Sequence, residues 1–306
     1  MPAKHPEIIC LGEPMAEFNQ QPDGRYQYGH GGDISNCAVA AARQGAHVGI
    51  ISALGEDNFG QSFLELWKKE GIDTAGVSIN PAAPTGIYFV THGPDGHEFT
   101  YRRKGSAASL MQPADLPQET IAAARILHVS GISQGISDNT AQTVSEAIDM
   151  ARAHDTLVSY DTNLRLKLWP LDKARKVIHE AMARCDIALP GMEDASQLCG
   201  YDDPDAIADF YLDLGAKIVA LTLGAEGALV ATAEHRERIP SIEIEAIDAT
   251  AAGDTFDGVF LAHYVNSHDP FQAARYAVAA AALATTRYGA AESIPQRQEV
   301  SAIVNS

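Results

Sequence analysis

Short apolar runs of strand length alternate with longer amphipathic patterns along most of this 306-residue chain. The short runs predict strands, each flanked by turn residues: 7–12, 48–53, 126–130, 157–160, 187–189 and 218–223. Apolar residues at three- and four-residue spacing between the runs predict helices: 34–43, 59–70, 138–154, 171–184 and 205–214. This alternation predicts an α/β fold, with a mainly parallel sheet and helices on both of its faces.

Two segments, 14–31 and 86–104, interrupt the alternation. Both have the pattern of short amphipathic strands, with turns expected at 22–24 and 93–96. We interpret them together as a small β lid over one edge of the main sheet. A lid would matter for a transfer reaction, because it keeps water away from the group that is transferred.

The end of the chain predicts two more helices, at about 253–266 and 270–287, and the alanine-rich second one should pack closely. No repeat, low-complexity tract or linker is present, so we expect residues 1–306 to form a single domain. The chain has no apolar run of about 18 residues and no apolar leader at its start. Its four scattered cysteines predict reduced, mostly buried thiols in a cytoplasmic protein.

The formal net charge of −18 argues against nucleic acid or an anionic membrane surface as a partner. The same charge repels a nucleotide, so a nucleotide site would need local donors and a divalent cation. Basic residues that could serve locally, or could simply be solvated, are Arg102, Arg103, Lys104, Arg165 and Lys167.

Residues 247–258 suggest an anion site at a helix start. We expect an apolar strand at 242–247 to lead through small residues into the helix. Free N–H groups at that helix start can hold a phosphate, and the small residues at 251–253 let it approach the main chain. Asp254 follows in the first turn, which suits transfer of a phosphoryl group to a hydroxyl. The alternative is an ordinary helix-capping aspartate.

Residues 29–36 lead into the first helix with paired glycines, against which a polyol can lie. Asp33 and Asn36 offer an acceptor and a mixed donor and acceptor to its hydroxyls. The spacing is not that of a dinucleotide fingerprint. A plain helix start with Asp33 as its cap is the alternative.

The second lid segment ends at Arg103, whose forked guanidinium suits a carboxylate or keto oxygen. Tyr88 and Tyr101 lie on the same segment, either as hydroxyl partners of a substrate or in lid packing. Residues 161–165 follow a buried strand, at the end where open α/β sheets place ligands. Arg165 there could bridge substrate and phosphate, or be a surface arginine.

Residues 223–227 form a glycine turn that could run along a ribose and phosphates, or be an ordinary hairpin turn. Glu193 and Asp194 begin a helix, where they could act on Mg2+ through water or be common helix-start acids. Serine-nucleophile, P-loop and protein-kinase motifs are absent. Because no lysine is near Asp254, phosphate charge would be met by backbone N–H groups, Mg2+ and arginine.

Together these residues resemble the ribokinase-like, or phosphofructokinase-B, family of carbohydrate kinases, over nearly the whole chain. The residues 31–38 and 54–60 are similar to its N-terminal signature, and 248–254 to its C-terminal one. The resemblance implies a three-layer α/β/α ribokinase-like fold with a small β-sheet lid. Within the family the chain looks most like the 2-keto-3-deoxygluconate kinases.

The resemblance also implies roles for individual residues. Asp254 would be the catalytic base, and Ala251, Ala252 and Gly253 would form the anion hole with it. The implied contacts of the sugar acid are Gly31, Gly32, Asp33, Ile34, Ser35, Asn36, Tyr88, Tyr101, Arg103, Ile132 and Arg165. The implied contacts of ATP are Asn163, Arg165, Thr222, Gly224, Gly227 and residues 251–253.

Some positions depart from the family pattern. Ala251 replaces the first signature glycine, and the usual Asn-x-x-Glu motif is altered at 191–194, which bears on Mg2+. An acidic sugar contact of some members is missing from 288–292. Asp248, Thr250 and Ser293 would frame a monovalent cation such as K+.

We therefore expect an ATP- and Mg2+-dependent kinase that phosphorylates the primary hydroxyl of 2-keto-3-deoxygluconate. A fructokinase or another sugar kinase is the alternative enzyme, and a sugar- or nucleotide-sensing module is the alternative outside enzymes. A nicotinamide-dependent enzyme is disfavoured because its glycine fingerprint is absent. Family members often dimerise through the lid, so a homodimer is expected.

Overall fold

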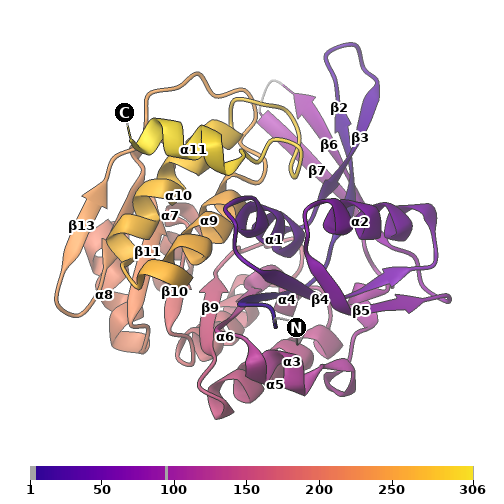
Figure 1. Ribbon diagram of the computed structural model, residues 1–306, viewed down its shortest axis with the longest axis horizontal. Coiled ribbons are helices and arrows are strands. Elements are labelled where there is room, and N and C mark those ends of the chain that lie inside the picture. The colour runs from indigo at the N-terminus through magenta and orange to yellow at the C-terminus, as the bar shows by residue number, and fades with distance from the viewer. Residues whose placement is uncertain (1–4, 94–95, 306) are drawn as a thin grey trace.

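The computed structural model describes residues 5–93 and 96–305, which form a large sheet, a small sheet and their helices (Figure 1). The large sheet has nine strands in the order β13-β12-β11-β10-β9-β8-β1-β4-β5. Their bounds are β1 (Ile8–Leu11), β4 (Val48–Gly55), β5 (Asp73–Asn80), β8 (Ile126–Ser130), β9 (Leu157–Asp161), β10 (Ile187–Leu189), β11 (Ile218–Thr222), β12 (Ala228–Ala231) and β13 (Arg236–Ile239). Pairing is parallel from β5 to β11 and antiparallel at β12 and β13. The predicted mainly parallel sheet is confirmed.

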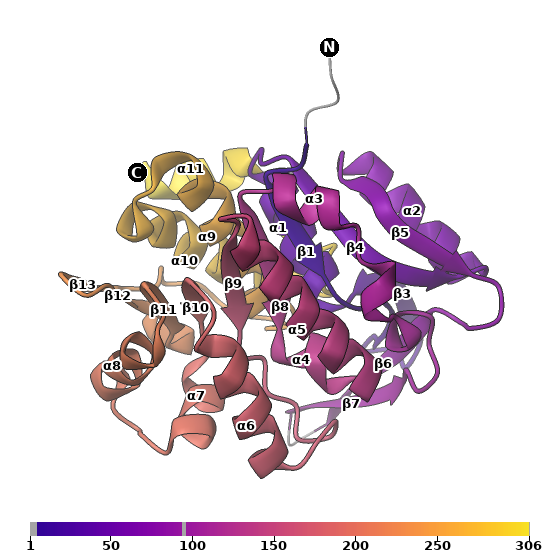
Figure 2. The same ribbon diagram turned by 90° about the horizontal axis from the view of Figure 1, so that it is seen from below.

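Helices cover both faces of this sheet and bury one hydrophobic core on each. One face carries α1 (Asp33–Arg43), α2 (Asn58–Lys69), α9 (Ala252–Ser267), α10 (Pro270–Ala284) and α11 (Arg297–Val304). The other carries α3 (Gln118–Ala123), α5 (Asp138–Ala153), α6 (Leu171–Met182), α7 (Met192–Cys199) and α8 (Pro204–Leu214), and Figure 2 shows α5 and α6 on this side. Side chains of β1 alternate between the cores, because Ile8 and Cys10 enter one and Ile9 and Leu11 the other. The three-layer α/β/α architecture is confirmed.

The starts of α1 and α9 lie close together because small residues line the contact between the two helices. A Cβ atom on Gly258 would collide with the Cys37 carbonyl oxygen and lie 2.7 Å from the Ala40 methyl group. Glycine at 258 therefore permits the approach. This packing brings the first turn of α9, with Asp254, beside the first turn of α1.

The small sheet has the strand order β3-β2-β6-β7 and stands out from one side of the molecule (Figure 1). Its strands are β2 (Met15–Gln20), β3 (Tyr26–Gly31), β6 (Gly86–Gly93) and β7 (Gly96–Arg102). These bounds confirm the two predicted lid segments, although β2 and β6 pair in parallel across them. The turn at 22–24 is confirmed, whereas residues 94 and 95 of the second predicted turn lie outside the described residues.

The predicted strand at 242–247 is wrong, because this segment is irregular chain between β13 and α9. Pro240 ends β13, which is an edge strand, and proline has no N–H group with which to extend the ladder. The amides of Ile247 and Asp248 instead both donate to the Thr285 carbonyl oxygen beyond the end of α10. Ile247 is half exposed, so its apolar side chain does not mark a core strand.

The four cysteines are free thiols, and three of them are buried, as predicted. Within the part of the chain that the structure describes, no helix is both long enough and apolar enough to cross a membrane.

Candidate active site

A cavity of about 750 Å³ opens between the lid and the carboxyl ends of the parallel strands. Strand ends, helix starts and lid side chains all contribute to its wall, as expected for an open α/β sheet. The predicted site residues that line it are Gly32, Asp33, Asn36, Tyr88, Tyr101, Arg103, Ile132, Asn163, Arg165, Glu193, Asp194, Thr222, Thr250, Ala251, Ala252, Gly253 and Asp254. Residues from distant parts of the chain thus meet at one site.

Several predicted site residues are not brought to the cavity wall. Ile34 packs in the hydrophobic core, and the Ser35 hydroxyl accepts a hydrogen bond from the Trp67 indole at 3.0 Å. Gly224 and Gly227 belong to the turn that joins β11 to the antiparallel β12, and their contact with ATP stays a prediction. The cavity wall also lacks Gly31, Asp248 and Ser293.

The cavity wall also contains residues for which the sequence predicted no place in the site: Met15, Phe99, Leu189, Ala249 and Asp257. A signal existed for Asp257, which lies one helical turn after Asp254. Asp161 and Gly191, which belong to segments that the sequence analysis singled out, also line the wall.

Asp254 lies in the first turn of α9 and is held by α1, because Asn36 Nδ2 donates to Asp254 Oδ2 at 2.8 Å. Burial raises the pKa of Asp254 to about 6, and the negative charge of Asp33 adds to this increase. The Asn36 hydrogen bond and the positive charge of Arg165 act in the opposite direction. Asp254 is therefore ionised at neutral pH yet far more basic than an exposed aspartate, which suits a general base.

The main chain beside Asp254 forms an anion cradle. Ala251 adopts a left-handed conformation with φ of 61° and redirects the chain into α9. A Cβ atom on Gly253 would find no protein atom within 4 Å, so this glycine exposes its backbone to the cavity. The N–H groups of a first helical turn lack helical acceptors and carry the positive end of the helix dipole. Here the Ala252 amide donates to the Ala249 carbonyl oxygen, so the amides that follow it in the turn are the ones that can face an anion. A phosphate can therefore sit directly on this turn.

We call the end of the cavity next to the lid the acceptor end, meaning the end expected to bind the phosphoryl acceptor. It contains buried side-chain oxygens that lack a hydrogen-bond partner among the described residues. Asp33 Oδ1 and Asn36 Oδ1 are both buried and have no hydrogen-bond partner among the described residues. The other Asp33 oxygen accepts from the Ser130 hydroxyl, which fixes the carboxylate in place. Since buried acceptors are normally satisfied, these two oxygens are suited to hydroxyl groups of a bound ligand.

Aromatic and basic side chains close this end from the lid. Tyr88 OH donates to Glu17, so the lid holds this tyrosine in place. Tyr101 lies under the Arg103 guanidinium, whose central carbon is 5.4 Å from the ring centre. Arg103 is also bound to the buried Glu13 carboxylate.

The other end of the cavity, between the strand ends and α7, is more open. Arg165 is exposed over 44% of its side chain, and its Nη1 is 3.9 Å from Asp194 Oδ2. Asn163 has φ of 28°, and its backbone N–H donates to the Asp161 carboxylate. Thr222 ends β11 at the same edge of the sheet. We call this the nucleotide end, because its open polar surface adjoins the cradle.

Glu193 and Asp194, the carboxylates near the nucleotide end, suit a metal ion that keeps most of its water ligands. Burial raises the pKa of Asp194, while Arg165 opposes the increase, and Asp194 Oδ2 accepts from the Leu164 amide. Among the described residues, no three His, Cys, Asp or Glu side chains converge on one metal position. Mg2+ commonly takes one or two carboxylates and completes its shell with water and phosphate oxygens. Glu193 and Asp194 fit that sparse arrangement.

Asp248 organises the loop before the cradle. Its Oδ1 accepts from the Thr250 amide at 2.9 Å and from the Thr250 hydroxyl at 2.6 Å. Its Oδ2 accepts from the Gly289 amide. Ser293 donates to the Ala290 carbonyl oxygen in the neighbouring turn. The cation site framed by Asp248, Thr250 and Ser293 stays a prediction.

The site combines a carboxylate of raised pKa, a helix start that can hold an anion, and buried oxygens that can accept hydrogen bonds from hydroxyl groups. Together these features suit phosphoryl transfer to an alcohol. Comparison with known proteins agrees. The family model of the pfkB family carbohydrate kinases matches residues 6–297, and the chain belongs to this family. It is therefore a sugar kinase with the ribokinase-like fold that its sequence predicts.

Individual relatives carry different substrate names. The chain is 33% identical to a 2-dehydro-3-deoxygluconokinase of Thermoproteus tenax, with 98% of this chain and 94% of the relative covered. It is 31% identical to fructokinase-1 of Oryza sativa subsp. japonica, with 98% of each covered. A solved fructokinase of Vibrio cholerae O395, with fructose, ADP and calcium ion bound, superposes with a TM-score of 0.88 at 25% identity and covers 98% of this chain and 99% of its own.

Proposed function

We propose that this protein transfers the γ-phosphoryl group of ATP to the primary hydroxyl of 2-keto-3-deoxygluconate, giving 2-keto-3-deoxy-6-phosphogluconate. The observation that carries the proposal is the place of Asp254, which Asn36 holds in the cavity wall at the first turn of α9. Arg103 lines the acceptor end of the same cavity and suits an acceptor that carries a carboxylate, while Arg165 lines the nucleotide end.

In this mechanism Asp254 takes the proton of the acceptor hydroxyl as its oxygen attacks phosphorus. The free oxygens of Asp33 and Asn36 bind other hydroxyls of the sugar and hold the reacting one in place. The cradle at 251–253 stabilises the negative charge of the transferred group, and Arg165 adds a positive charge at the nucleotide end. Glu193 and Asp194 would hold Mg2+ through water, and this ion, when bound, neutralises phosphate charge.

Fructose is the main competing acceptor, because fructokinases are nearly as similar to this chain as the 2-dehydro-3-deoxygluconokinases. Arg103 favours the sugar acid, since a neutral ketose has no carboxylate to pair with it. A panel of 2-keto-3-deoxygluconate, fructose and ribose, with ATP consumption as the readout, tests the proposal. We expect the highest kcat/KM on the sugar acid. A higher value on fructose would replace this assignment, and no consumption with any sugar would favour a sensing module.

Two accompanying proposals concern assembly and ions. The lid carries a cluster of packed aromatic rings, of which the two tyrosines are exposed: Phe18, Tyr26, Tyr28 and Phe89. We propose that a second copy of this chain covers them in a homodimer, which analytical ultracentrifugation of Tyr26→Ser against wild type would test. We also propose that K+ binds by Asp248, which substitution of K+ by tetramethylammonium in the assay would test.

A further inference from the structure

Glu13 is a buried charge to which the proposed reaction gives no role. It follows β1, it has no exposed surface, and it is not part of the cavity wall. A Cβ atom on Gly86 would lie only 2.8 Å from Glu13 Oε1, so protein atoms fill the space around the carboxylate. Glu13 is therefore buried behind the cavity wall, with no surface of its own in the cavity.

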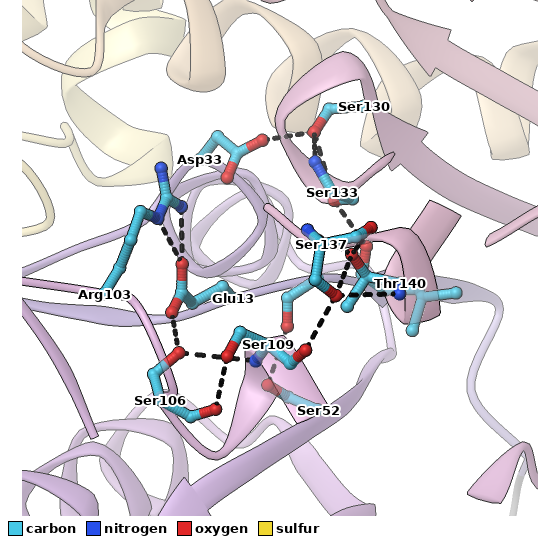
Figure 3. A network of polar contacts seen from close by, with 12 residues as sticks. Glu13, Asp33, Ser52, Arg103, Ser106, Ser109, Ser130, Ser133, Ser137 and Thr140 are labelled. Carbon is cyan, nitrogen blue, oxygen red and sulfur yellow. Dashed lines mark hydrogen bonds and ion pairs between the residues drawn. The ribbon is translucent and has the colours of Figure 1, made fainter. Parts of the chain in front are cut away.

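Among the described residues, the hydrogen bonds of the Glu13 carboxylate join it to Arg103 and Ser106, which follow lid strand β7 (Figure 3). Its Oε2 accepts from Arg103 Nε at 2.7 Å and lies 2.5 Å from Arg103 Nη2. Its Oε1 accepts from the Ser106 hydroxyl at 2.5 Å. Ser106 is itself fixed, because its hydroxyl accepts from the Ser109 amide. The Glu13 carboxylate thus holds one edge of the Arg103 guanidinium and is itself held by Ser106.

The contact with Glu13 uses two of the five guanidinium N–H groups, one on Nε and one on Nη2, and leaves both N–H groups of the third nitrogen available. Nε and Nη2 are occupied by Glu13, and in Figure 3 the third nitrogen points away from it. Arg103 lines the cavity while only 10% of its side chain is exposed. The orientation of a long, flexible side chain is thereby fixed before the substrate binds, which lowers the ordering cost of substrate binding.

We propose that Glu13 is the positioning residue that sets acceptor affinity, by holding Arg103 in the orientation that meets the sugar. This rests on the proposed function of the cavity, in which Arg103 contacts the acceptor. It extends that function to a residue that contacts neither substrate.

The test compares Glu13→Met, which removes the acceptor oxygens at similar length, with Glu13→Gln, which keeps one. Because a hydrogen bond to a charged group is lost, KM for the acceptor should rise at least about tenfold in Glu13→Met. KM for ATP should stay within about twofold, and Glu13→Gln should recover most of the loss. A merely structural role would reduce the amount of folded enzyme, which lowers apparent kcat but leaves KM for the acceptor unchanged.

Two controls sharpen the comparison. Glu70→Met breaks a similarly buried arginine–carboxylate pair, that of Arg43 and Glu70 at 2.7 Å, away from the cavity, and should leave both KM values unchanged. In an Arg103→Met background, adding Glu13→Met should raise KM no further, because Glu13 acts through that arginine.

The proposal is overturned if Glu13→Met keeps the acceptor KM of wild type, if Glu13→Gln is as damaged as Glu13→Met, or if the two losses add in the double variant. The acceptor used is the sugar that the wild type phosphorylates best. If that sugar is neutral, the sugar-acid assignment falls, while the role of Glu13 is still tested.

Discussion

The two ends of the cavity are built differently. At the acceptor end, Arg103 is exposed over only 10% of its side chain and is bound to a fully buried carboxylate at 2.5–2.7 Å. At the nucleotide end, Arg165 is 44% exposed, and its acidic neighbour is 3.9 Å away. The acceptor end is therefore preorganised by the protein, whereas the side chains of the other end are held more loosely. Asp254 lies where the two ends meet.

The largest effect is expected from Asp254→Asn, which removes the base but keeps the shape. Turnover should fall by at least about 10²-fold, the lower end of what general-base catalysis contributes. Binding of both substrates should change little, since the Asn36 contact can be kept. Steady-state kinetics and equilibrium binding of ATP check this, and near-normal turnover would remove Asp254 from the mechanism.

Arg165→Met tests the open end. Loss of its charge should raise KM for ATP and lower kcat, each by about tenfold, because the lost contact to phosphate is charge-assisted. KM for the acceptor should move much less than it does in the Arg103→Met variant. Arg238→Met is the matched control, because Arg238 on β13 is an exposed arginine that pairs with Asp205 on α8. Equal changes in both KM values would show that the two ends do not differ.

The pH dependence of kcat/KM tests the role of Asp254, which lies where the two ends of the cavity meet. Asp254 must be ionised to accept a proton, and its pKa is raised to about 6. Therefore kcat/KM should be flat above that pH and fall about tenfold per unit below it. Asn36→Ala removes a hydrogen bond that lowers this pKa, so the acid limb should move to higher pH. A limb that stays in place would separate Asp254 from the observed titration.

The smallest effect is expected from Ala251→Gly. Ala251 holds a left-handed conformation that costs an L-residue about 1–2 kcal/mol, and glycine adopts it freely. After the greater flexibility of glycine in the unfolded chain is counted, we expect a gain of up to about 1 kcal/mol in unfolding free energy. Urea denaturation measures it, and a loss of stability would show that the alanine methyl group packs favourably.

Much of the fold was predictable because its central strands are buried on both faces and read as apolar runs. The missed strands lie at or near the sheet edges: no residue of β5 is fully buried, and β12 and β13 are short. The wrong strand at 242–247 had apolar residues, yet the chain there is irregular and Ile247 is half exposed. Local pattern identifies core strands better than it identifies edges.

Site residues next to motif turns were predictable, whereas their partners were not. Asp254 and Asp33 follow from helix starts, because a helix start presents its first turn to a ligand. The pairing of Glu13 with Arg103 joins residues 90 positions apart, and no local spacing encodes it. Ile34 and Ser35 were assigned with their neighbours, yet helical geometry turns them into the core.

A crystal structure with the sugar acid and a non-hydrolysable ATP analogue tests the central claim most directly. The account predicts that an oxygen of Asp254 lies about 2.6–3.2 Å from the acceptor hydroxyl, which faces the terminal phosphate on the cradle. Asp254 facing solvent, with the nucleotide phosphates bound elsewhere, would contradict it.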